Sequence, residues 1–269
     1  MLNPYRLKEL TLFDFYHSLT SLKSLAFIIP YFLFWFLFFD NLNELAVENL
    51  KSAQGLFVAS WLLQDQDLVL QMFVDRSASL SLYLIVSLTV APLFILLAAN
   101  NQYSSDASRG AFRFILTRAT RMELYISRFI AVSLLVLLCI FLTSLWASVL
   151  AFLNEEETPD LIITYGLQTF TIVCFYNLPF IAFMSMVSAF ARSTFGCLCL
   201  GMMLYVFLIV LSLWLKSDIQ YASYLIPSGV KSFLLNINPE NIFISVAALC
   251  CYTLVYFVCG WNIFKRRDM

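Results

Sequence analysis

The residues of this sequence best suited to binding chemistry are arginines that cluster in one short stretch. Only 12% of the chain is charged and 61% is hydrophobic, yet five arginines fall within residues 109–128: Arg109, Arg113, Arg118, Arg121 and Arg128. A guanidinium forms forked hydrogen bonds with carboxylates, phosphates and backbone carbonyls. Phe112 and Phe114 stand among these arginines. Aromatic side chains beside guanidinium groups are suited to binding in a groove of a partner protein. The simpler alternative is that the arginines anchor this stretch to lipid phosphates.

A second candidate site is a stripe of polar side chains in the apolar segment 163–188. On an ideal helix, most of them fall within about 80° of arc. The members are Tyr165, Gln168, Thr169 and Tyr176, with Asn177 rotated away. Such a stripe could line a translocation path. The alternative is hydrogen bonding between helices, worth about 0.6 kcal/mol per bond. The sequence leaves both interpretations open.

Several kinds of catalytic chemistry find no support. There is no G-x-x-x-x-G-K-[ST] phosphate loop, so we do not expect the chain to hydrolyse ATP itself. No His-Glu-x-x-His pattern occurs, and apart from Lys23 at the edge of the first span no charged residue lies inside a predicted span. The seven cysteines fall in predicted spans with no histidine nearby, which favours packing over metal binding or disulfides. We therefore assign no catalytic residue and no metal or cofactor site, and expect no enzyme.

Long charge-free segments indicate the elements that position these residues. A mean hydropathy of +0.84 is typical of a membrane protein. Because a helix needs roughly 20 apolar residues to cross hydrocarbon, and lipid cannot satisfy the backbone, we predict an all-α membrane protein. The six predicted transmembrane helices are 22–39, 79–99, 129–152, 163–188, 195–215 and 242–264. No linker or repeat divides the chain, so 1–269 is predicted to be one domain.

The distribution of positive charge predicts the orientation. Placing the N-terminus in the cytoplasm leaves only Lys51, Arg76, Lys216 and Lys231, of 16 Lys and Arg residues, outside. Both termini and the arginine-rich stretch are then cytoplasmic, and the plasma (bacterial inner) membrane is the expected location.

The sequence also predicts the structure of the segments outside the spans. Residues 5–22 are predicted to form an interfacial amphipathic helix with Asp14 and His17 on its polar face, where His17 contacts solvent or head groups. We expect surface helices within 40–78, a solvated acidic loop at 154–160, and a short hairpin within 216–241, before the last span.

Two motifs support a family resemblance. Asp106 is followed by Gly110, an apolar run, Arg121 and then Arg128 at the next span, and the chain ends in FKRRDM at 264–269. This layout resembles type-2 ABC transporter permeases, the membrane subunits of ATP-driven exporters. Their loop usually has an acid, three residues, Gly-Thr-Leu, a helical run and a proline ahead of an arginine, and Phe-x-Arg-Arg-Asp-Leu is a common ending. The chain departs from the pattern at Asp106 for Glu, Ala111 and Phe112 for Thr-Leu, and Ala119 for Pro.

The resemblance implies a coupling helix at 107–117 that seats in a groove of a cytoplasmic ATPase. Its implied contact residues are Asp106, Arg109, Gly110, Phe112, Arg113, Phe114, Arg118 and Arg121. Arg118 is equally suited to lipid phosphates, and for Arg128 we favour the lipid role. Which phenylalanine faces the partner is left open.

The implied assembly has a second permease copy or homologue, two ABC ATPase subunits that bind ATP and Mg²⁺, and membrane lipids, but no nucleic acid. The cargo and the choice between homodimer and heterodimer remain open. Two alternatives are a non-transporting scaffold that recruits a cytoplasmic partner and an intramembrane lipid-modifying enzyme.

Overall fold

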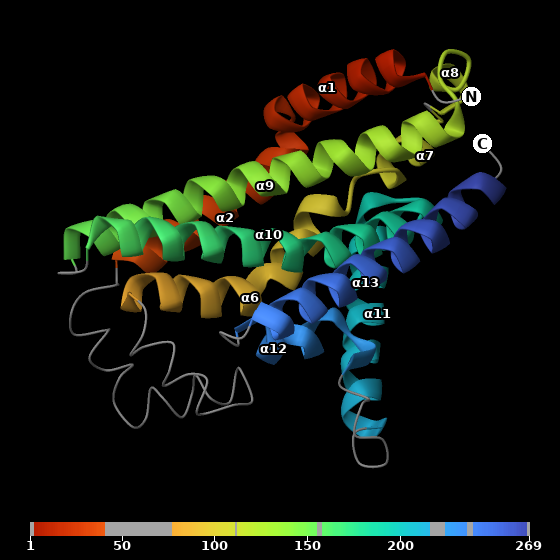
Figure 1. The fold of residues 1–269 in the computed structure, drawn as a ribbon. Helices are drawn as coiled ribbons and strands as arrows, with labels where there is room; N and C mark the ends of the chain where they lie inside the picture. Colours follow the sequence, from red (N-terminus) through yellow and green to blue (C-terminus); the bar gives the residue numbers. More distant parts are fainter. Residues whose placement is uncertain are drawn as a thin grey trace.

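The computed structural model describes residues 3–40, 77–110, 112–154, 158–215, 224–235 and 239–267, and these are helical with no strand. Figure 1 shows the arrangement of the helices. In chain order they are α1 (Pro4–Thr20), α2 (Leu22–Asp40), α6 (Ala78–Ala99), α7 (Ser104–Arg109), α8 (Phe112–Ile115), α9 (Arg121–Asn154), α10 (Pro159–Phe190), α11 (Thr194–Leu215), the 3₁₀ turn η2 (Pro227–Val230), α12 (Lys231–Leu235) and α13 (Pro239–Arg266).

Five helices of the described chain are long and apolar enough to cross a membrane: α6, α9, α10, α11 and α13. A sixth candidate is α1 with α2, which together pass the same test but are bent by 62°. The prediction of an all-α protein with several long apolar helices is thus confirmed.

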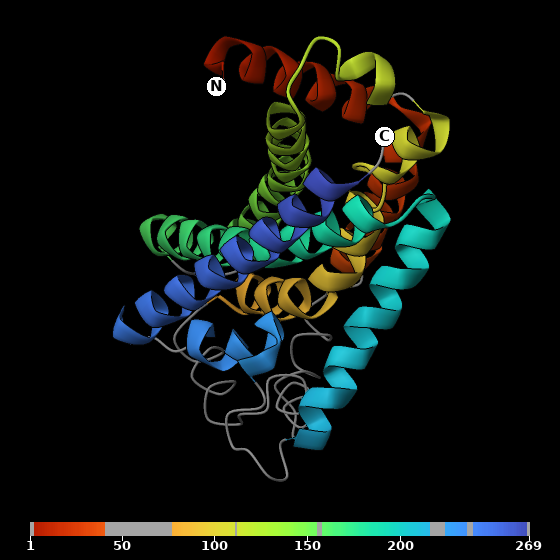
Figure 2. The same ribbon diagram turned by 90° about the vertical axis from the view of Figure 1, so that its right-hand side faces the viewer.

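The helices form a bundle from which α11 diverges. In Figure 1, α6, α9, α10 and α13 run in roughly similar directions, while α11 leaves at a steep angle. Figure 2 shows the same divergence from the side. The most apolar stretch of α10 is 67% buried, whereas those of α11 and α13 are each only 11% buried. The bundle therefore has α10 at its centre and leaves two apolar helices largely uncovered.

The start of α9 shows why the sequence placed its boundary too late. We predicted a span from residue 129, where charge ends, but α9 begins at Arg121. Thr120 and Glu123 form a capping box: Glu123 N–H donates to Thr120 Oγ1 (3.3 Å), and Thr120 N–H donates to Glu123 Oε2 (2.9 Å). The other carboxylate oxygen of Glu123 accepts the N–H of Asn3 (2.8 Å). This cap extends the helix beyond the apolar segment and ties it to the N-terminus.

Helix α1 is amphipathic as expected, but its polar side faces the protein. Thr11 is buried, and Asp14 is largely covered, with its carboxylate near Arg128 of α9. Phe13 and Tyr16 are exposed instead. Helix α1 thus packs against α9 through the polar side on which the sequence placed Asp14. His17 is exposed.

A close helix crossing positions α13 against the bundle. Gly260 lies where a Cβ would meet the Cα of Met186 on α10 at 2.9 Å and would collide with the hydroxyl of Tyr125 on α9. Only glycine permits this approach, so α9, α10 and α13 meet there at a fixed distance.

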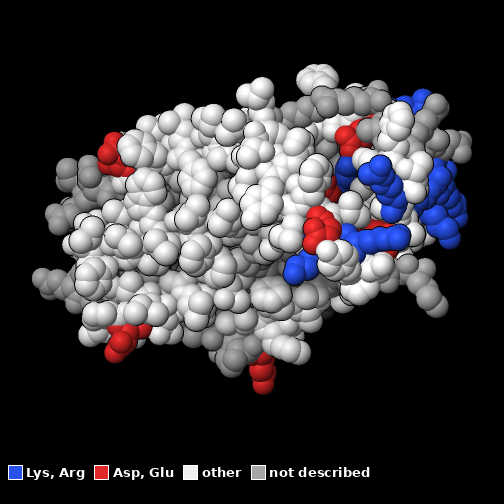
Figure 3. Space-filling view, turned by 90° about the horizontal axis from the view of Figure 1, so that it is seen from above, with Lys and Arg blue, Asp and Glu red and all other residues white. Residues whose placement is uncertain are grey.

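Charges sit at the ends of the molecule. Figure 3 shows Lys and Arg gathered at one end with several acidic groups among them, a broad uncharged middle, and further acidic groups away from that end; both termini lie at the basic end (Figure 1). The segments expected on the outer surface fall largely outside the described residues. Of 216–241, η2 and α12 are described, and both are short helical turns, consistent with part of the predicted hairpin. The centre of the predicted acidic loop, residues 155–157, also lies outside the described residues.

Candidate functional site

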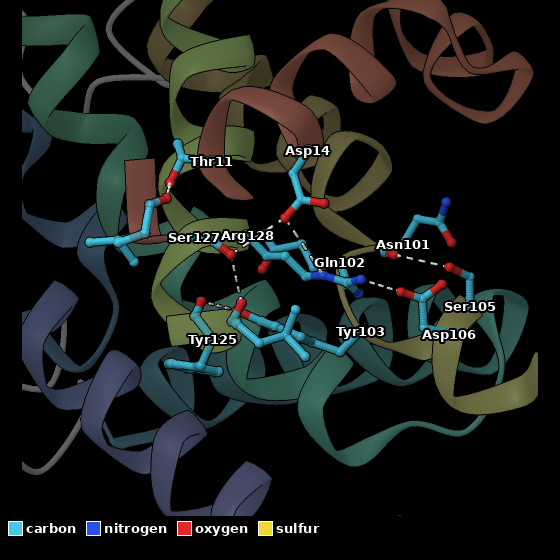
Figure 4. Close-up of polar contacts among 12 residues, drawn as sticks. Thr11, Asp14, Asn101, Gln102, Tyr103, Ser105, Asp106, Tyr125, Ser127 and Arg128 are labelled. Carbon is cyan, nitrogen blue, oxygen red and sulfur yellow. Dashed lines mark hydrogen bonds and ion pairs between the residues drawn. The ribbon is translucent and has the colours of Figure 1, made fainter. Parts of the chain in front are cut away.

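The candidate site lies at the basic end and is organised around Arg128 of α9. Figure 4 shows its guanidinium between Asp14 of α1 and Asp106 of α7. Nη2 donates to Asp106 Oδ2, Nη1 donates to the backbone oxygen of Gln102 (2.6 Å), and Nε lies 3.9 Å from Asp14 Oδ2. The Arg128 side chain is only 11% exposed. One guanidinium therefore joins α1, the α6–α7 connection and α9.

Asp14 has an environment that works against its charge. Burial raises the pKa of its carboxyl group, and the guanidinium of Arg128 opposes that effect. Ser127 Oγ also donates to Asp14 Oδ2, at 3.4 Å. The carboxylate of Asp14 therefore has one long hydrogen bond and one distant ion pair, although the side chain is largely covered.

The segment before α7 is fixed to α10. The backbone N–H groups of Tyr103 and Ser104 both donate to Ser188 Oγ, at 3.0 and 3.2 Å. The Tyr103 hydroxyl donates to the Tyr125 carbonyl at 2.8 Å. Ser185 Oγ donates to the side-chain oxygen of Gln102. These bonds hold the start of α7 on the bundle without using any arginine.

The arginine-rich loop is broken at Gly110, which adopts φ +66°. This left-handed conformation ends α7 and is accessible to glycine at little cost. The loop is therefore two short helices, α7 and α8, and the prediction of one helix through 107–117 is wrong. Beyond the break, Phe112 is 2% exposed and Phe114 is 80% exposed.

Phe112 anchors α8 to the bundle. Its ring meets the edge of Phe264 from α13 with centroids 5.7 Å apart, and the guanidinium carbon of Arg128 lies 5.7 Å from the ring centroid. The same cluster includes Tyr103, Leu124 and Tyr125. Phe114, by contrast, presents its ring to the surroundings.

The C-terminal end of α13 is held by two arginines. Arg121 Nη1 donates to the carbonyls of Lys265 (2.7 Å) and Arg267 (3.1 Å). Arg267 in turn donates to the carbonyls of Ala189 (2.8 Å) and Ala191 (2.9 Å) at the end of α10. Lysine could not make the same forked contacts. These guanidinium contacts thus give residues 264–267 of the FKRRDM segment a structural role in joining α9, α10 and α13.

A family model described as "Protein of unknown function (DUF2705)" matches residues 57–269, which is most of the chain. The chain belongs to the DUF2705 family. A comparison with curated proteins found no match. The match in this DUF2705 chain includes the whole arginine-rich loop and the C-terminal segment.

The structure of this DUF2705 member separates the predicted loop residues into two groups. Asp106, Phe112 and Arg121 make contacts within the chain, whereas Phe114 and Arg118 are exposed. The side chains of Arg109 and Arg113 lie outside the described part. Arg128, for which we favoured a lipid role, has two carboxylates and a carbonyl of the chain around its guanidinium, so any lipid contact would have to share it with these groups.

Sequence reasoning named Asp106 but missed the other partners of Arg128. Gln102, whose carbonyl accepts from Arg128, and Ser185, which donates to Gln102, are uncharged and belong to no motif, and Asp14 was assigned to the polar side of α1 without a partner. The only available signal was the helical spacing that puts Asp14 on the polar side of α1. Among the described residues, no group of three or more His, Cys, Asp or Glu side chains could hold a metal ion.

The polar stripe of α10 lies mostly inside the bundle. Thr169, Tyr176 and Asn177 are buried, and Tyr165 and Gln168 are half-buried. Asn177 Nδ2 donates to the carbonyl of Val173 on its own helix. Sequence reasoning also missed Lys231 of α12, whose ammonium lies 5.9 Å from the centroid of the Tyr176 ring. Burial lowers the pKa of Lys231 to about 8.

Proposed function

We propose that this protein is the permease subunit of an ATP-driven exporter of the type-2 ABC class. In this proposal α7 and α8 dock on a cytoplasmic ATPase, and the basic end of the molecule faces the cytoplasm of a bacterial inner membrane. The observation that carries the proposal is Phe114, a large aromatic side chain 80% exposed on a loop that is otherwise anchored to the bundle. Exposed aromatic residues on a rigid support are typical centres of protein interfaces.

The contacts of the loop suit a coupling role. A partner that displaced α8 would move Phe112 against Phe264 of α13. A displacement of α7 would pull on Asp106 and thus on Arg128, which also faces α1. Energy released by an ATPase would therefore reach three helices through direct contacts rather than through a flexible linker. If the arginines served only to orient the chain in the membrane, the Phe112–Phe264 contact and the Asp106–Arg128 ion pair would not be needed.

The transport path is proposed to form with a second permease copy or homologue. The apolar faces of α11 and α13 are largely uncovered in one chain, which is compatible with contact to lipid and to a second subunit. Tyr165 and Gln168 are the stripe residues left half-buried, and they remain candidates to line the path. Thr169, Tyr176 and Asn177 can contribute only if the bundle opens, because they are buried within it.

Copurification tests the proposal. The tagged chain would be coexpressed with the ABC ATPase encoded nearest to it, purified in lipid nanodiscs and assayed for ATP hydrolysis. We expect a stable complex with two ATPase subunits whose hydrolysis depends on the permease. A permease that binds no ATPase, although folded and monodisperse, would contradict the proposal and favour the scaffold or the lipid-modifying enzyme.

A further inference from the structure

A cavity of about 430 Å³ opens beside Arg128, between α1, the α6–α7 connection and α9. Its volume is in the range of about 300–1,000 Å³ that is common for small-molecule sites. Figure 4 shows the polar groups around it, including Asp14, Asn101, Gln102, Asp106 and Arg128. The coupling role proposed above uses the ion pairs at its wall but not the space itself.

The cavity wall is divided between polar and apolar residues. One group consists of charged, amide, imidazole and hydroxyl side chains: Asp14, His17, Ser18, Ser21, Ser24, Asn101, Gln102, Ser105, Asp106 and Arg128. The other consists of aliphatic side chains: Leu22, Ala98, Ala131, Val132 and Leu135. Both groups are present in the same space, so its occupant should carry a polar head and an apolar portion.

Two buried donors of this wall have no hydrogen-bond partner among the described residues. They are Gln102 Nε2 and Arg128 Nε. A buried donor without a hydrogen bond costs free energy, and Arg128 Nε has only the Asp14 carboxylate at 3.9 Å; a ligand oxygen that reached these donors would lower that cost. A phosphate group offers several strong acceptor oxygens and pairs well with a guanidinium.

The charge of the wall argues against a purely anionic occupant. Among the described residues of the wall, two carboxylates, Asp14 and Asp106, face one guanidinium, that of Arg128. Beside these groups, an added phosphate diester would leave negative charge in excess unless the occupant also carried a cation. A primary ammonium would supply it and donate N–H groups to Asp14. A quaternary ammonium has no such donors and is usually bound by aromatic cages, whereas the described residues of this wall include no Phe, Tyr or Trp.

We propose that this cavity binds the head group of a phosphatidylethanolamine-type lipid from the adjacent leaflet. The phosphate pairs with Arg128 and Gln102, the ammonium pairs with Asp14, and the acyl chains leave along the aliphatic part of the wall. Exposed apolar residues of α1, including Phe13 and Tyr16, indicate that this helix already lies against lipid. The bound lipid would join α1 to α9 at the position where the ion pairs also join them.

Lipid binding to the full-length wild-type chain tests this proposal without any transport assay. Delipidated protein in detergent would be titrated with phosphatidylethanolamine, phosphatidylcholine and phosphatidylglycerol that carry identical acyl chains. Binding would be followed by native mass spectrometry and by thermal unfolding. We expect phosphatidylethanolamine to bind about tenfold more tightly than the other two, the ratio expected for one charge-assisted hydrogen bond. Equal binding of the three lipids, or preference for phosphatidylglycerol, would overturn the proposal.

Two further arms test the source of the ligand and the residue that selects it. O-phosphoethanolamine has the head group without acyl chains, and its binding as tightly as the lipid would exclude a lipid site. The near-isosteric Asp14→Asn should abolish the preference for phosphatidylethanolamine over phosphatidylcholine. The matched control Glu9→Gln removes an exposed carboxylate of the same helix that is not part of the wall, and should retain the preference. An unchanged preference in Asp14→Asn would contradict the assigned role of Asp14.

Discussion

Arg128 and Asp106 lie 22 positions apart and form a largely covered ion pair that attaches α7 to α9. The side chains are 11% and 22% exposed. Because both groups are largely removed from water, losing the pair costs more than losing an exposed one, although Asp14 still lies 3.9 Å from Arg128 Nε. Asp106→Asn should therefore lower the free energy of unfolding by about 2 kcal/mol. Thermal unfolding of the purified protein measures this, with the exposed Asp160→Asn as the control. Equal stability of the two variants would mean that the pair contributes little.

The crossing at Gly260 predicts a steric effect. In Gly260→Ala the new Cβ would lie 2.9 Å from the Cα of Met186, and backbone cannot yield as a flexible side chain can. We expect a loss of about 1–3 kcal/mol in the free energy of unfolding, typical of overpacking. Gly196→Ala is the control, since its Cβ would meet the side-chain oxygen of Ser193 at 2.8 Å, and a hydroxyl can rotate away where backbone cannot. A tolerated Gly260→Ala would show that α13 does not require this close approach.

Lys231 predicts a pH dependence of stability at alkaline pH. Its pKa in the folded protein is about 8, below the ordinary value of 10.5, because burial disfavours the ammonium. Between these values the unfolded chain binds more protons than the folded chain, so stability should rise as pH increases from about 8 to about 10.5. Thermal unfolding across this window should show the stability of the wild type rising relative to that of Lys231→Met. Identical pH profiles would contradict the assigned pKa.

Apolar helices were predictable because lipid imposes one solution on the backbone. Segments without charge must be helical, so α6, α9, α10, α11 and α13 follow from the gaps between charges. Their ends do not follow, because hydrogen bonds to caps fix them. The T-x-x-E pattern of Thr120 and Glu123 did indicate the true start of α9, but the end of the charged stretch suggested residue 129.

The site was less predictable for two reasons. Helical spacing identified the two sides of α1 but not which side packs on α9, and that choice decides the environment of Asp14. The arginines look alike in sequence, whereas their partners come from distant segments: Asp106 for Arg128, and the carbonyls of Lys265 and Arg267 for Arg121. Only the packed structure distinguishes these arginines from the exposed Arg118.

Association with the ATPase after replacement of Phe114 tests the central claim most directly. Phe114 is 80% exposed and makes little contribution to the bundle, so Phe114→Ala should leave thermal unfolding unchanged. If α8 is the docking element, the same variant should weaken ATPase binding by about 2 kcal/mol, roughly 30-fold, as expected for an aromatic interface anchor. Phe13→Ala removes a comparably exposed aromatic ring from α1 and should bind normally. Full ATPase binding and hydrolysis with Phe114→Ala would contradict the assignment of α7 and α8 as the coupling segment.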